Sequence, residues 1–166
     1  MTTNELYLKT VFSCIACDGD IAPEEVDLVQ KLCKENDAFK GIDAETLVNK
    51  WVEEINAQGG TFLKNYLREV EDEELNEEQQ LQVINLALEA IEIDNRIEYS
   101  EVKFFKKIRF RLPISDEAIL AVHPDKEDFL LPDINVIEDP FWDDKTQFEQ
   151  ISLNLDFDTN VNLNNQ

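Results

Sequence analysis

The chain has few helix-breaking residues and few positive charges. Its 166 residues include only four glycines and five prolines, among many Glu, Leu and Lys residues, and this composition favours an all-helical body. Lysine and arginine number 15 against 37 Asp and Glu, for a formal net charge of −22. That charge argues against general nucleic-acid binding and against attachment to an anionic membrane surface, because both need Lys and Arg. Cations and basic protein surfaces are its natural partners.

The sequence also lacks the marks of disulfide bonding, membrane insertion and secretion. Three cysteines, an odd number, do not make a disulfide framework in a chain of this length. No apolar run approaches the roughly 18–20 residues that span a bilayer. The N-terminal region carries Glu5 instead of a basic segment, and its apolar stretch ends at Asp18, which is not typical of a signal peptide. We therefore expect a cytoplasmic protein without direct membrane insertion.

Recognisable catalytic machinery is missing as well. The chain has one histidine, and it contains no Ser-His-Asp arrangement, Gly-rich phosphate loop or His-containing metal triad. Catalysis would have to rest on carboxylates alone, and nothing in the sequence marks a substrate pocket. We expect no catalytic residues, no residues that bind an organic cofactor, and no enzymatic activity.

Helical periodicity dominates the chain up to about residue 122. Apolar residues recur every three to four positions, and the capping residues Asp43, Asn76 and Ser115 stand before three of the apolar runs. The Gly59-Gly60 pair separates two further runs. The pattern predicts helices at about 3–17, from 23, at 44–57, 61–70, 77–94 and 99–111, and from 116. We therefore predict an all-α fold in which residues 1–122 form a compact bundle of about seven helices.

The composition changes from His123 onward. Residues 123–166 contain eleven Asp and Glu against Lys126 and Lys145, together with three prolines. Near the end, apolar residues follow a period of two across residues 151–163, which is a strand signal. We predict an acidic, proline-containing tail with a candidate strand at 151–163. The favoured alternative is a disordered tail that sometimes folds back on the bundle, and the other is a segment that adds a strand to a partner's sheet.

The main functional clue is an internal repeat. The stretch DGDIAPEEV at residues 18–26 returns, with changes, as DNRIEYSEV at residues 94–102, an offset of 76 residues. Each copy reads as an apolar helix, an Asp-(Gly/Asn)-x-Ile turn, and a second helix with Glu seven residues after the Asp. Two related hairpins in one bundle commonly pack about a pseudo-two-fold axis, which would bring the two acidic loops to corresponding positions.

Two interpretations of the repeat stay open. In the first, the residues are structural: Glu25 and Glu101 fall at the third helical position, where Glu favours the positive helix end and reaches back to the cap amide. In the second, carboxylates held close together repel one another, and a hard cation relieves the repulsion. Oxygen-only ligands favour Ca²⁺, Mg²⁺ or Mn²⁺ over zinc. The spacing excludes an EF-hand, whose Glu stands at position twelve.

The paired motif is similar to the hallmark of the tellurite-resistance TerB family, and the similarity covers about residues 3–122. The resemblance implies a seven-helix fold whose acidic cluster binds metal, in chemical-stress and anti-phage responses associated with membrane complexes. By matching position it assigns Asp18, Glu25, Asp94 and Glu101 to the cluster. With Asp20 from the first loop added, these residues are the candidate metal ligands. The second copy departs from the pattern at Asn95 and Arg96, and Arg96 replaces the acidic Asp20.

Three functional hypotheses follow from the sequence. The first is a TerB-like stress- or defence-associated domain whose acidic loops bind a divalent cation, a basic protein partner, or both. The alternative is a protein-interaction adaptor whose C-terminal tail docks a partner, with purely structural loops. The third is a thiol switch through Cys14 and Cys17, which needs an exposed thiol with a lowered pKa.

Overall fold

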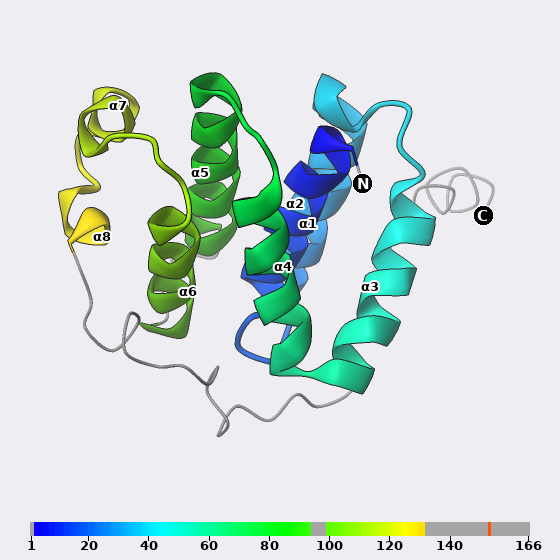
Figure 1. Ribbon diagram of the computed structural model, residues 1–166. Helices are drawn as coiled ribbons and strands as arrows, with labels where there is room; N and C mark the ends of the chain where they lie inside the picture. The colour runs from blue at the N-terminus through cyan, green and yellow to red at the C-terminus, as the bar shows by residue number, and fades with distance from the viewer. Residues whose placement is uncertain (1, 94–98, 132–152, 154–166) are drawn as a thin grey trace.

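Helix α1 (Thr3–Ala16) lies at the centre of the molecule (Figure 1). Every residue from Leu6 to Ala16 is buried, so the helix needs neighbours on all of its sides. The computed structural model describes residues 2–93, 99–131 and Leu153. In this part of the chain the neighbours are α2 (Pro23–Glu35), the 3₁₀ turn η1 (Asp37–Phe39), α3 (Ala44–Gln58), α4 (Gly60–Asp72), α5 (Glu77–Glu92) and α6 (Tyr99–Phe110). The short helices α7 (Asp116–Val122) and α8 (Glu127–Leu130) complete the described part.

The predicted all-α fold is confirmed, and so are the helix starts that capping residues predict. The carboxylate of Asp43 accepts a hydrogen bond from the Thr46 N–H at 3.2 Å where α3 begins. Asn76 and Gln79 form a reciprocal capping box before α5, with bonds of 2.8 and 2.9 Å. Residues within one turn therefore mark where these helices begin.

A glycine turn brings α3 and α4 together beside α1. Gly59 ends α3 and precedes α4 with φ +59°, a conformation that side chains with a Cβ rarely adopt. The turn places Trp51 of α3 and Phe62 of α4 against Phe12 of α1, with ring centroids 5.8 and 5.7 Å away. These aromatic contacts form one side of the core.

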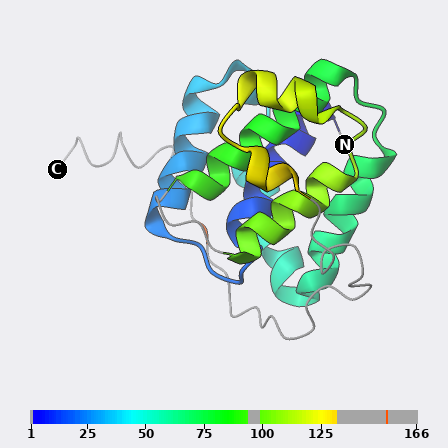
Figure 2. The ribbon, with the colours of Figure 1, turned by 90° about the vertical axis from the view of Figure 1, so that its left-hand side faces the viewer.

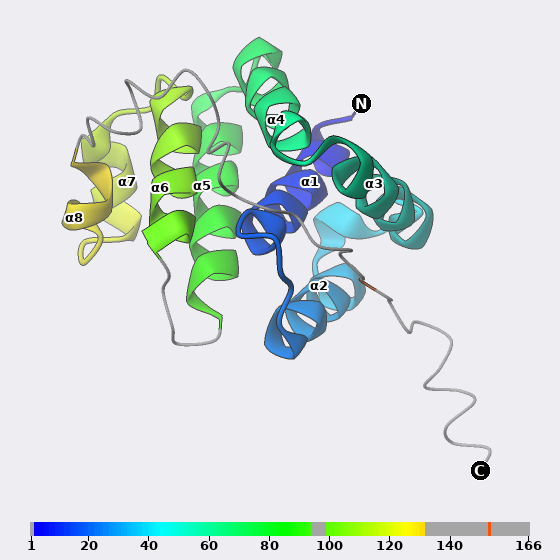
Figure 3. The same cartoon turned by 90° about the horizontal axis from the view of Figure 1, so that it is seen from below.

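Helices α1 and α5 lie side by side, with α2 next to α1 and α6 next to α5 (Figure 3). The helix bounds agree with the sequence offset of 76: Ala16 and Glu92 end α1 and α5, and Pro23 and Tyr99 begin α2 and α6. The two hairpins α1–α2 and α5–α6 therefore correspond element by element. A pseudo-two-fold axis between them stays a prediction.

Packed helical structure is also present beyond residue 122. Helices α7 and α8 cover α5 and α6 from outside (Figure 2). The His123 side chain lies 2.6 Å from the Asn85 side-chain oxygen, and Lys126 pairs with Glu92 at 2.7 Å. The Phe129 ring packs on Phe105 with centroids 5.8 Å apart. Residues 123–131 thus belong to the helical body.

Leu153 is the single described residue of the distal tail, and it is buried in the hydrophobic core. The candidate strand at 151–163 otherwise lies outside the described residues, and no strand occurs in the part of the chain that the structure covers. The helices of that part are all too short or too polar to cross a membrane.

Candidate functional site: the acidic loops at the end of α1

The first acidic loop is built on local hydrogen bonds of its aspartates. Gly19 takes φ +87° directly after α1, and its N–H reaches the Ala16 carbonyl at 3.0 Å. Asp18 Oδ1 accepts the Asp20 N–H at 3.1 Å, and Asp20 Oδ1 accepts the Ile21 N–H at 3.0 Å. Both aspartates are exposed. The loop therefore presents two carboxylates to solvent on a defined turn.

The Glu25 side chain caps the N-terminus of α2. Ala22 occupies the N-cap position and has no side chain that could cap the helix, while Pro23 takes the first helical position. The Glu25 carboxylate accepts the Ala22 N–H at 2.7 Å. The predicted contact between Glu25 and the cap amide is thus confirmed.

Glu25 of α2 and Glu101 of α6 are both buried, and both influence the thiols in the last part of α1 and just after it. Only 6% of Glu25 and 4% of Glu101 is exposed. Burial raises the pKa of the Cys14 thiol, and the negative charges of Glu101 and Glu25 raise this pKa further. The pKa of the Cys17 thiol is also well above its ordinary value, because of burial, then of Cys14, and then of Asp18, Glu101 and Glu25. Carboxylates from both copies of the motif therefore contribute to the electrostatic environment of the same two thiols.

The same data oppose the thiol-switch hypothesis. Cys14 and Cys17 are buried, and Cys33 is half-buried. Burial raises the pKa of Cys33 to about 11, so all three thiols are protonated near neutral pH. The Cys17 thiol donates a hydrogen bond to the Cys14 carbonyl at 3.2 Å. A redox switch needs an exposed thiolate, and none of these cysteines supplies one.

Three of the five candidate ligands influence the same thiol, and their role as metal ligands stays a prediction. Asp18, Glu25 and Glu101 all act on Cys17, whereas Asp94 lies outside the described residues. In the described ranges, no three His, Cys, Asp or Glu side chains are grouped closely enough to hold a metal ion. Asp20 uses its carboxylate on the neighbouring backbone. The donor set is oxygen from carboxylates, which fits a hard cation such as Ca²⁺ or Mg²⁺.

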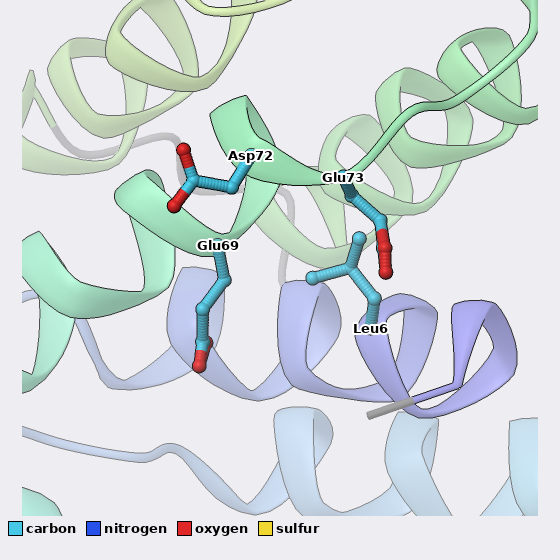
Figure 4. A pocket seen from close by; sticks show the side chains of 4 residues that line it. All are labelled: Leu6, Glu69, Asp72 and Glu73. Carbon is cyan, nitrogen blue, oxygen red and sulfur yellow. The ribbon is translucent and has the colours of Figure 1, made fainter.

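A second acidic feature, between α1 and the end of α4, escaped the sequence interpretation. A surface pocket of about 210 Å³ is lined by Leu6, Glu69, Asp72 and Glu73 (Figure 4). The carboxylates of Glu69 and Glu73 extend toward α1, and that of Asp72 points away from it. The lining thus consists of one leucine and three acidic residues, a composition complementary to a basic side chain.

Glu69 also pairs with a buried lysine. The Lys9 ammonium donates to both Glu69 oxygens at 2.7 and 3.0 Å, and it lies 4.9 Å from the centroid of the Phe62 ring. Glu69, the first residue of the acidic run 69–74, therefore has a buried cation as its partner. The sequence feature that could have indicated this pair is Lys9, a charged residue within the apolar sequence of α1. Its ammonium group needs a partner because the helix is buried.

The chain was compared with known protein families, curated proteins and solved structures. No protein family, curated protein or solved structure significantly matches the chain. The similarity to the TerB family therefore rests on the paired motif alone and stays a prediction.

Proposed function

We propose that this chain is a non-enzymatic, cytoplasmic TerB-like domain of stress or defence responses whose paired acidic loops bind a divalent cation. The observation that supports this proposal is the shared electrostatic effect of Asp18, Glu25 and Glu101 on the thiol of Cys17. These influences come from carboxylates of both copies of the repeat, which is what a shared site requires. Asp94 takes the position in the second copy that Asp18 holds in the first.

The physical reason for cation binding is mutual repulsion. Carboxylates near one another in a partly buried place raise the free energy of the folded state, and a bound cation lowers it again. The net charge of −22 adds a long-range field that concentrates cations near the surface. Ca²⁺, Mg²⁺ and Mn²⁺ are the expected ligands, since the donors are oxygens.

Thermal unfolding of the chelator-treated protein tests the proposal. Cation at a hundred times its Kd should stabilise the folded state by about 2.7 kcal/mol. For a chain of this size that corresponds to a rise in Tm of roughly 5–10 °C. The Asp18→Asn/Asp94→Asn variant should lose this rise, because asparagine keeps the oxygen that accepts the Asp20 N–H but carries no charge.

A charge-matched control separates site binding from general screening. Asp27→Asn/Glu89→Gln removes two exposed carboxylates from α2 and α5. This control should respond to the cation as the parent does. No rise in the parent at millimolar cation, or an equal loss of response in both variants, would contradict a composite site.

The second candidate is the protein-interaction adaptor. It is favoured by the hydrogen bonds of Asp18, Asp20 and Glu25, which account for each of these residues without a ligand. The acidic pocket beside α4 supports a basic protein surface as the partner. In this case Asp18→Asn/Asp94→Asn should leave Tm unchanged both with and without cation.

A further inference from the structure

Leu153 returns to the helical body from far along the chain. It is 22 positions beyond Leu131, where the preceding described segment ends, and only 2% of it is exposed. It belongs to the same hydrophobic cluster as the residues of the central helices. A side chain from the acidic tail therefore contributes to the core. This observation is independent of the proposed cation site.

The chain between Leu131 and Leu153 is long enough to reach any part of the helical body. Twenty-two residues span up to about 73–79 Å when fully extended. A body of roughly 130 residues has a radius of gyration of about 14 Å. A tether of this reach holds a segment near its binding surface at a millimolar effective concentration, so intramolecular docking is favoured over association between two chains.

The net charge of this segment opposes its attachment to the body. Residues 132–166 carry eight Asp and Glu against the single Lys145, and the whole chain has a net charge of −22. An acidic segment is repelled by an acidic body, and the burial of the apolar Leu153 side chain opposes this repulsion. Around Leu153 the sequence alternates: Ile151, Leu153 and Leu155 are apolar, while Ser152 and Asn154 are polar. Alternate residues of an extended chain share one side.

We infer that the helical body carries an interaction surface for an extended apolar segment, and that the protein's own C-terminal segment occupies it through Leu153. The anchor is a buried leucine within an acidic, weakly hydrophobic tail. Salt should strengthen this attachment, because it screens the repulsion between tail and body and leaves apolar burial intact. A segment held mainly by opposite charges would respond to salt in the other direction.

Thiol reactivity in the full-length chain tests the inference. Leu153→Cys and Asn154→Cys are each made with Cys33→Ser, so that the buried Cys14 and Cys17 are the only other thiols. The thiol at position 153 should react about tenfold or more slowly than the thiol at 154, since a site that opens a tenth of the time reacts at a tenth of the rate. The slower rate should not change with protein concentration and should fall further at high salt.

Limited proteolysis gives a second readout that does not depend on an engineered thiol. Leu153→Asp should make residues 132–166 more sensitive to protease than the charge-matched Asn154→Asp, while the helical body stays folded. Equal thiol rates at 153 and 154, or equal cleavage of the two aspartate variants, would overturn the inference. Protection that rises with protein concentration would also overturn it, because the occupant would then be a second copy of the chain.

Discussion

Removing the carboxylate of Glu69 should destabilise the protein well beyond what a surface substitution does. Its partner Lys9 has a side chain that is only 7% exposed, enclosed between α1 and α4. Glu69→Gln leaves the Lys9 ammonium in place. It removes the negative charge of the carboxylate that accepts both hydrogen bonds from Lys9. The nearby Trp51 and Phe62 rings attract the cation but do not replace a carboxylate.

The size of the effect follows from the burial of the two partners. Breaking a buried ion pair by removing one side costs about 3–5 kcal/mol, while an exposed pair contributes about 0–1 kcal/mol. Because 34% of the Glu69 side chain is exposed, water compensates for part of the loss. We therefore expect about 2–3 kcal/mol, which corresponds to a fall in Tm of roughly 5–10 °C.

Urea unfolding at neutral pH measures this difference. Asp72→Asn is the matched control, because Asp72 lines the same pocket and its carboxylate points away from α1. The double variant Lys9→Met/Glu69→Leu should recover most of the lost stability, since apolar side chains replace a buried pair at little cost. Equal stability of Glu69→Gln and Asp72→Asn, within about 0.5 kcal/mol, would refute the buried-pair reasoning.

Two further predictions concern pH and thiol chemistry. Hydrogen bonds from Thr46 lower the pKa of Asp43 from its ordinary value of 3.8. The ionised Asp43 side chain therefore contributes fully to stability above pH 3.8. This contribution is lost as the pH falls through the lower pKa of the folded state. Asp43→Asn keeps a capping oxygen that does not titrate, and its Tm should fall less steeply in acid than that of the parent; parallel curves would contradict this. Near neutral pH, a thiol reagent should modify the folded protein slowly and at Cys33 alone. The rate of this modification should increase as the pH approaches about 11, the pKa of Cys33. Rapid labelling of Cys14 or Cys17 would contradict the burial and pKa shifts assigned to them.

Local sequence signals were sufficient for most of the fold. Asp43, Asn76 and Ser115 cap the helices that they were expected to cap, because a cap depends on residues within one turn. The short helix α8 was not predicted, since four residues carry little periodicity and α8 is fixed by tertiary contacts. One of these is the packing of Phe129 on Phe105. The burial of Leu153 depends likewise on contacts that no local pattern specifies.

Sequence spacing was sufficient to predict the capping contact of Glu25, but not how the candidate site residues are arranged in space. The capping role of Glu25 follows from spacing alone, and it is confirmed by the bond to the Ala22 N–H. The approach of Glu25 and Glu101 to the same thiols depends on how two hairpins pack, and sequence offset does not fix that. The Lys9–Glu69 pair joins residues 60 positions apart, and many acidic residues could have been the partner of that lysine.

The position at which a paramagnetic cation binds tests the composite site most directly. Mn²⁺ broadens the amide NMR signals of residues close to it. At substoichiometric Mn²⁺, the proposal predicts selective broadening at residues 17–25 and 93–101 in the parent, and loss of this broadening in Asp18→Asn/Asp94→Asn. Broadening that spreads over the acidic surface, that centres on the pocket beside α4, or that persists in the double variant would contradict a cation site shared by the two loops.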